Sequence, residues 1–379
     1  MSGRTVRAAA FLLALPALCL AHDAGHTVTF AGVSGARFAV QARGASLAPI
    51  AAGDASVRPD RLVFDSGLSD PITEPWDTVL IQGEAPDAKI GFEVSREDGA
   101  EWTPLDMHRF SGGRFWAKAR LKEAAGPLRL RAIDSGAKSD HEVTIYGVEA
   151  FVDEPASAGS PAIPPRGPQN PGAARPLVHS RSEWKAVSPT EPWSPDPRPW
   201  RVTLHHSDGK HTATLAESEA EARFIQDFHI HGRGWIDIAY HFLVDSQGNI
   251  LEGRPEGVLG AHTLGNNEGN IGIVLLGTYH PPVNNVPTKA QLDAVAALGR
   301  YLVARYGIEP KSLKGHRDYK QTDCPGNLAY AKLDVLRLAF GDLPQPPAFI
   351  AKPAPRLAEP IAWLTQPSFD GGEAVFPGL

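Results

Sequence analysis

A proline-rich segment divides this chain into two parts with different sequence patterns. Residues 153–177 are dominated by Pro, Ala, Gly and Ser. A segment of this composition cannot bury a core and is typical of an extended, moderately stiff linker. We therefore expect separate domains that the linker holds apart and allows to reorient. The length of 379 residues is consistent with two to three domains.

The part before the linker, residues 26–152, is predicted to be an all-β, sandwich-like domain. Turn residues such as Gly112-Gly113 and Gly126-Pro127 separate its short apolar runs, several of which alternate with polar residues. Trp102 and Trp116 either fill the core of such a domain or form a sugar-stacking platform. The predicted strands cover residues 77–81, 89–94, 114–121, 128–133 and 141–146.

The part after the linker, residues 178–341, is predicted to be an α/β domain with a mixed central sheet flanked by helices. Residues 215–230 and 288–306 show helical periodicity, and Thr288 and Gly307 mark the ends of the second helix. Residues 239–245 alternate as a strand. Residues 270–277 are apolar on both faces, which predicts a buried central strand. A proline-rich tail, residues 342–379, follows and carries no motif with recognisable chemistry.

The N-terminus has the pattern of a secretory signal peptide. Arg4 and Arg7 precede an apolar run that ends at Ala21, with Cys19 and Ala21 as the small residues before the cleavage point. The run is too short to span a bilayer comfortably. We therefore expect residues 1–21 to be removed from an exported periplasmic or extracellular monomer without a membrane span.

Charge and cysteine content narrow the possible functions. A net charge of -6 argues against nucleic acid as a partner, because such proteins need a basic surface. The chain has two cysteines, and Cys19 would leave with the signal peptide. The remaining Cys324 cannot form a disulfide within the mature chain. A metal thiolate explains it better than an inert buried cysteine does.

Three candidate metal ligands lie in three short motifs. Gly315-His316-Arg317-Asp318 precedes Cys324-Pro325-Gly326 near the end of the α/β region, and a predicted strand upstream ends in His205-His206. Two imidazoles and one thiolate suit an open zinc site, in which water takes the fourth position. Zinc lowers the pKa of such a water to about 7. The motifs thus predict a hydrolytic Zn2+ centre.

The second domain resembles the zinc amidases of the peptidoglycan recognition protein and phage lysozyme-type family. The resemblance covers residues 178–336, and its landmarks occur in the order of the family. They are Ser180-Arg181-Ser182-Glu183-Trp184, Leu204-His205-His206-Ser207, Gly234-Trp235-Ile236-Asp237-Ile238-Ala239-Tyr240-His241-Phe242, Gly260-Ala261-His262, Ile271-Gly272-Ile273, Gly315-His316-Arg317-Asp318 and Thr322-Asp323-Cys324-Pro325-Gly326.

The resemblance implies roles for five residues of the centre. His205, His316 and Cys324 match the zinc ligands of the family. Tyr240 matches the tyrosine whose hydroxyl faces the reacting water and can donate to the developing oxyanion. Thr322, also expected to be catalytic, stands where other branches have a lysine. The implied activity is hydrolysis of the amide between N-acetylmuramic acid and L-alanine of peptidoglycan.

The resemblance also implies a substrate groove. Gly234 and Trp235, with Arg254 nineteen residues further on, match the pattern that goes with diaminopimelate-type muropeptides. Arg254 would pair with the additional carboxylate of diaminopimelate. His262 is expected to line the groove. His206, which is not a ligand in the family, is expected to support the ligands and is counted with these substrate-binding residues.

Alternative functions remain open at this point. The family includes non-catalytic peptidoglycan-binding modules, but these have lost the metal ligands that this chain keeps. A structural zinc site lacks a fourth protein ligand, and a zinc peptidase would need a His-Glu-x-x-His helix. One departure from distant amidases is that Ile273-Val274-Leu275 provides no catalytic glutamate. The N-terminal domain would either direct the enzyme to the wall or act as a spacer.

Overall fold

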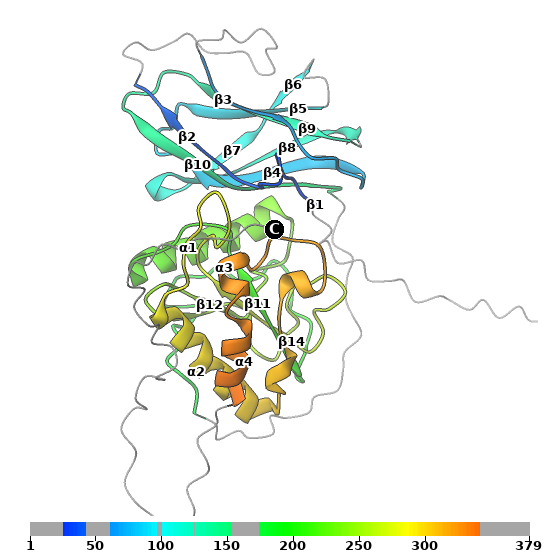
Figure 1. The fold of residues 1–379 in the computed structure, drawn as a ribbon, viewed down its shortest axis with the longest axis vertical. Coiled ribbons are helices and arrows are strands. Elements are labelled where there is room, and N and C mark those ends of the chain that lie inside the picture. The colour runs from blue at the N-terminus through cyan, green and yellow to red at the C-terminus, as the bar shows by residue number, and fades with distance from the viewer. Residues whose placement is uncertain (1–25, 43–60, 97–100, 125, 154–173, 342–379) are drawn as a thin grey trace, which may run out of the picture.

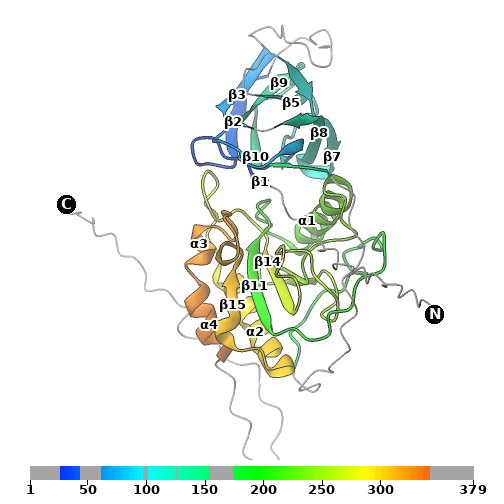
Figure 2. The ribbon, with the colours of Figure 1, turned by 90° about the vertical axis from the view of Figure 1, so that its right-hand side faces the viewer.

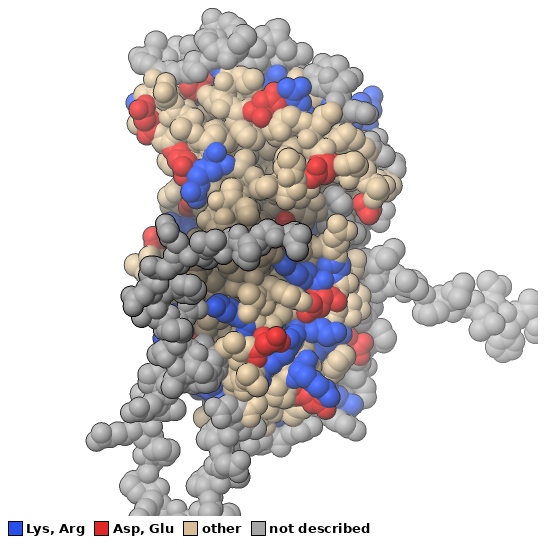
Figure 3. Space-filling model, in the orientation of Figure 1, with Lys and Arg blue, Asp and Glu red and all other residues tan. Residues whose placement is uncertain are grey.

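The computed structural model describes residues 26–42, 61–96, 101–124, 126–153 and 174–341, which form two stacked domains (Figures 1 and 2). The predicted signal peptide, most of the linker and the C-terminal tail lie outside these residues. Among the described residues, no helix combines the length and apolarity needed to cross a bilayer. Basic and acidic side chains are interspersed on the face of the second domain that Figure 3 shows.

The N-terminal domain is a sandwich of two antiparallel sheets. One sheet has the order β1-β10-β4-β8-β7, with β2 also paired to β10, and the other has the order β3-β9-β5-β6. The all-β prediction is confirmed. The strands are β1 (His26–Thr27), β2 (Ala36–Val40), β3 (Leu62–Leu68), β4 (Trp76–Glu84), β5 (Ile90–Arg96), β6 (Trp102–Pro104), β7 (Asp106–Arg109), β8 (Arg114–Ala124), β9 (Leu128–Asp134) and β10 (His141–Phe151).

Alternation along β4 and β8 gives this domain two apolar faces. Because successive side chains of a strand point to opposite faces, Val79 and Phe115 enter the core between the two sheets. Their neighbours Leu80 and Trp116 belong to a different apolar cluster, outside the sandwich. Trp102 is buried as well. Burial favours packing over the sugar-stacking interpretation for both tryptophans.

The second domain has a mixed five-stranded sheet with helices on its faces, as predicted. The sheet order is β13-β12-β14-β11-β15, in which only the β12–β13 pair is antiparallel. The elements are β11 (Arg201–His206), α1 (Leu215–Asp227), a π-helical turn (Phe228–Gly232), β12 (Phe242–Val244), β13 (Ile250–Glu252), β14 (Asn270–Leu275), α2 (Lys289–Tyr306), β15 (Leu313–Gly315), α3 (Asn327–Tyr330) and α4 (Leu333–Gly341).

The central strand β14 is buried on both faces, as its sequence predicts. Ile273 packs in the cluster that α2 and α4 cover, whereas Val274 packs in the cluster that α1 covers. The helix α2 has the predicted caps: the Thr288 side chain accepts from Gln291, and Gly307 adopts a φ of 70°. The strand predicted at residues 239–245 is shorter, because only Phe242–Val244 pairs with β14.

The two domains pack tightly against each other, so the expectation that the linker holds them apart is wrong. Leu80, Trp116 and Phe151 of the sandwich share one apolar cluster with α1 and the strands behind it. A bidentate ion pair joins Arg114 to Glu221, with nitrogen–oxygen distances of 2.9 and 2.8 Å. These side chains are only 5% and 2% exposed. The linker composition could not reveal this interface, because the contacts come from residues remote from it.

Replacing Arg114 by alanine should destabilise the protein strongly. The change leaves the buried Glu221 carboxylate without its partner, which typically costs about 3–5 kcal/mol. Arg120→Ala is the matched control, because the Arg120 side chain is 64% exposed in its ion pair with Asp77 and such pairs contribute about 0–1 kcal/mol. Denaturant midpoints of both variants test this, and equal midpoints would contradict a stabilising role for the interface pair.

Candidate functional site

The register of two parallel strands, β11 and β15, brings two candidate ligands together. Leu204 of β11 lies opposite Gly315 of β15, so the next residues along each strand are His205 and His316. Both strands run in the same direction, and their carboxyl ends therefore meet at one edge of the sheet. The rings of His205 and His316 are 4.7 Å apart between centroids.

Arg317 ties the third candidate ligand to the same edge. Its backbone N–H donates to the Cys324 carbonyl at 3.0 Å, and its guanidinium donates to Asp323 and to Asn327. The Cys324 Sγ consequently lies 3.4 Å from the His205 Nδ1. One donor atom from each of His205, His316 and Cys324 lies within 4.8 Å of the others. The structure thus gathers the three predicted ligands into one buried group.

A chain of hydrogen bonds fixes the orientation of His205. The Asn270 carbonyl can only accept, so His262 donates to it from Nε2 at 2.9 Å. Burial first, and neighbouring histidines second, hold the pKa of both His205 and His262 well below 6.5. Neutral His262 therefore accepts at Nδ1 from His205 Nε2, 3.0 Å away. The lone pair of His205 Nδ1 is left pointing towards Cys324, as a metal ligand requires.

Two glycines leave room for the His262 ring. A Cβ at Gly272 would lie 2.6 Å from His262 Cδ2, and one at Gly260 would lie 2.5 Å from the same atom. His262 was predicted to bind substrate, and it is among the residues that line the cleft. Both of its ring nitrogens, however, have partners inside the protein. Its geometry is that of a residue that positions His205.

The other predicted residues of the centre lie around the same cleft. Tyr240, Thr322 and His206 all line it, and the Tyr240 ring is 5.2 Å from that of His205. The Thr322 hydroxyl accepts from the Cys324 backbone N–H at 3.3 Å, so it shapes the ligand loop. Burial raises the pKa of the Cys324 thiol, and only a cation or a hydrogen-bond donor at Sγ would favour its thiolate.

Of the three predicted specificity residues, only Trp235 lines the cleft. Trp235 lines the cleft, whereas Gly234 provides no lining surface and adopts a φ of 73° that favours glycine. Arg254 does not reach the cleft, so the prediction that it pairs with a substrate carboxylate is corrected. It is buried and donates to the carbonyls of Ile238 and Leu259 at 2.7 Å. Burial lowers the pKa of Arg254 to about 10.

Sequence reasoning missed several residues of the cleft. His229 follows α1 and lines the cleft beside Tyr240, with ring centroids 5.6 Å apart. Its Nδ1 accepts from the Ala239 N–H at 3.1 Å, and burial lowers the pKa of His229 to about 3. The neutral ring therefore carries its proton on Nε2. The sequence placed His229 within a predicted helix but gave no sign of a role at the site. Lys320 and Arg233 also line the cleft and belong to none of the motifs that the sequence analysis used.

A second group of possible ligands lies next to the first. His206, Asp208 and His280 bring one donor atom each to within 4.8 Å of one another. Asp208 accepts from His280 Nε2 at 3.2 Å. Burial opposes the charge of His280, but this bond outweighs it and raises the pKa of His280. The pair is explained as a local ion pair that fixes the loop after β11.

Comparison with known proteins finds a family match within the second domain. A family model described as N-acetylmuramoyl-L-alanine amidase matches residues 195–327. Peptidoglycan-recognition protein SC2 of Drosophila simulans is 37% identical over 150 residues, which is 39% of this chain and 80% of that protein. The N-acetylmuramoyl-L-alanine amidase of Sus scrofa is 34% identical over 167 residues, 42% of this chain and 27% of that protein.

One solved structure among the matches is peptidoglycan recognition protein-LE in complex with tracheal cytotoxin. Its sequence is 32% identical, and the alignment covers 42% of this chain and 92% of that one, with a TM-score of 0.40. The family model begins at residue 195 and therefore does not include the sandwich domain.

Adding a methyl group at Gly272 should disturb the support of His205. The new Cβ would press on the His262 ring, and overpacking of a filled interior costs about 1–3 kcal/mol. Gly257→Ala is the matched control, because a Cβ there meets nothing within 4 Å. Denaturant unfolding of the two variants measures the difference. Equal stability would show that the His262 ring is not held as tightly as described.

Proposed function

Because the chain belongs to the family of peptidoglycan recognition proteins and N-acetylmuramoyl-L-alanine amidases, we propose that it is an exported zinc-dependent amidase. Its substrate would be the amide between N-acetylmuramic acid and the L-alanine of the stem peptide. The observation that carries this proposal is the buried group of His205, His316 and Cys324, of which His316 and Cys324 line a cleft together with Tyr240.

The donor set supports zinc as the metal. One thiol and two imidazoles match the borderline-soft character of Zn2+, and three protein ligands leave a position for water or substrate. His205 would bind through Nδ1, since its Nε2 donates to His262. Bound zinc would polarise the scissile carbonyl and lower the pKa of a water at neutral pH.

Two residues that line the cleft can donate hydrogen bonds to the carbonyl oxygen of the scissile amide. Tyr240 can donate its hydroxyl proton in a hydrogen bond to the carbonyl oxygen as negative charge develops there. Neutral His229, protonated on Nε2, adds a second donor beside it. The cleft offers few carboxylates for proton transfer: among its described lining residues only Glu149 and Asp208 carry one, and these pair with Arg233 and His280.

The alternative function is peptidoglycan binding without cleavage. A recognition module needs the groove but not the metal ligands. Retention of all three candidate ligands, together with the hydrogen-bond chain that orients His205, favours the amidase. The buried apolar residues Ile273, Val274 and Leu275 provide no acid in β14. Catalysis would therefore depend on the metal, Tyr240 and His229.

The decisive experiment measures release of stem peptide. Purified full-length protein, without the predicted signal peptide, is incubated with diaminopimelate-type muropeptides and analysed by mass spectrometry. We expect free stem peptide that disappears on zinc chelation and in Cys324→Ala, since both remove the metal. Binding without release by zinc-loaded protein would instead identify a recognition module and refute the proposal.

Removing the Tyr240 hydroxyl should slow catalysis without loss of the metal. Tyr240→Phe is expected to lower kcat by about 10²–10³-fold, the effect of losing one oxyanion donor. Zinc content, measured by elemental analysis, should stay at the wild-type level. Tyr306→Phe is the matched control, because the Tyr306 hydroxyl bonds to Glu256 at 2.8 Å, outside the cleft. An unchanged kcat in Tyr240→Phe would exclude this role.

A further inference from the structure

We propose that the N-terminal domain forms one wall of the substrate cleft and that Glu149 on this wall binds the muropeptide. The inference rests on the proposed function for the identity of the ligand. It assigns the sandwich domain a part in the binding site itself, in place of the targeting or spacer role that its sequence suggested.

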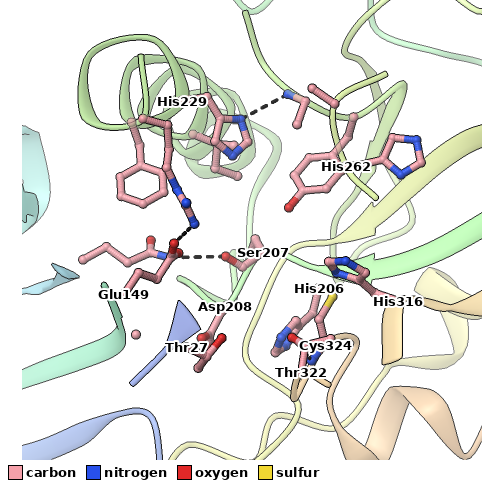
Figure 4. A pocket seen from close by; sticks show the side chains of 18 of the residues that line it. Thr27, Glu149, His206, Ser207, Asp208, His229, His262, His316, Thr322 and Cys324 are labelled. Carbon is pink, nitrogen blue, oxygen red and sulfur yellow. Dashed lines mark hydrogen bonds and ion pairs between the residues drawn. The ribbon is translucent and has the colours of Figure 1, made fainter. Parts of the chain in front are cut away.

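Residues of three strands of the sandwich reach the cleft. Thr27 of β1, Gln82 of β4 and residues 147–149 of β10 line the same space as the candidate metal ligands. Figure 4 shows Thr27 and Glu149 on the opposite side of this space from His316 and Cys324. A ligand that fills the cleft therefore contacts both domains.

The shape of β10 directs Glu149 towards the second domain. The pairing of β10 with β4 is irregular between Ile145 and Gly147, and such bulges re-aim the following side chains. Val148 enters the sandwich core, so its neighbours Gly147 and Glu149 face outwards. Phe151, two residues further on, packs in the apolar cluster between the domains.

Close contacts hold this wall in place at the cleft. A Cβ at Gly147 would lie 3.0 Å from Asp208 Oδ2, so the absence of a side chain allows β10 to approach the loop after β11. The Gln82 amide donates to the Ser207 carbonyl at 3.5 Å. Glu149 forms an ion pair with Arg233 across the interface. The position of the wall is thus fixed by contacts beside the ligands and by the Arg114–Glu221 pair behind them.

The Glu149–Arg233 pair links the wall to the predicted specificity motif. The guanidinium of Arg233 lies 5.3 Å from the centroid of the Trp235 ring and 5.2 Å from that of Phe151. Arg233 therefore contacts aromatic residues of both domains. The Glu149 carboxylate adds hydrogen-bond acceptors for the amides and hydroxyls of a muropeptide to this surface.

Hydrogen exchange detects the contact directly. Full-length protein is kept with a chelator so that the muropeptide is not consumed, and amide exchange is followed by mass spectrometry with and without ligand. We expect binding to slow exchange in the peptide containing residues 147–149 but not in the peptide containing β3, which lies in the other sheet. Unchanged exchange at residues 147–149 under saturating ligand would overturn the proposal.

A matched pair of isosteric substitutions tests Glu149. Glu149→Gln should weaken muropeptide binding at least fivefold by calorimetry, because the amide keeps the size of the side chain but removes its charge. Glu84→Gln removes a carboxylate that faces Lys210 across the same interface, at 3.9 Å, but does not line the cleft. It should bind as wild type does. Equal affinities of the two variants would overturn the role of Glu149. If Glu149→Gln fails to fold, the exchange measurement on the wild-type chain still decides.

The two proposals can fail separately. Release of stem peptide tests the amidase, whereas exchange and affinity test the wall. A protein that binds with protection at residues 147–149 but never cleaves would refute the amidase and support the wall. A protein that cleaves the muropeptide but shows no protection at residues 147–149 would support the amidase and refute the wall.

Discussion

The parallel pairing of β11 with β15 is the constraint on which the candidate site depends. It places His205 and His316 at one edge of the sheet although they are 111 positions apart in the sequence. Bonds of Arg317 and Thr322 in the segment after β15 then bring Cys324 beside them. A slip of this register would separate the two imidazoles, and the three candidate ligands would no longer lie close together. The same strand pairing therefore determines both the sheet and the candidate metal site.

Burial gives the site its electrostatic character. Because water is largely excluded, His205, His229 and His262 remain neutral, and each ring has a defined tautomer set by a backbone or histidine partner. Neutral, oriented imidazoles serve as ligands and as hydrogen-bond donors without competing protonation. The same burial raises the pKa of the Cys324 thiol and so disfavours its thiolate. A cation bound at this position would favour the thiolate again.

The sequence predicted those features that depend on local patterns. The fold classes, the central strand and the caps of α2 follow from periodicity and from residues such as Thr288 and Gly307. Candidate ligands followed from motifs. Arg254 shows the limit, because its motif position could not reveal that backbone carbonyls of a neighbouring loop surround its guanidinium. The domain interface was missed for a similar reason: Leu80 and Trp116 look like ordinary outward residues of alternating strands.

The shared apolar cluster between the domains has a consequence for synthesis. The sandwich leaves the ribosome first, and until α1 has formed, the outer face that carries Leu80, Trp116 and Phe151 has no partner within the chain. Exposed apolar surface of this kind attracts other unfolded chains during folding. A sandwich that folds before α1 is complete therefore presents this face to other chains, and the packing of α1 removes that route to aggregation.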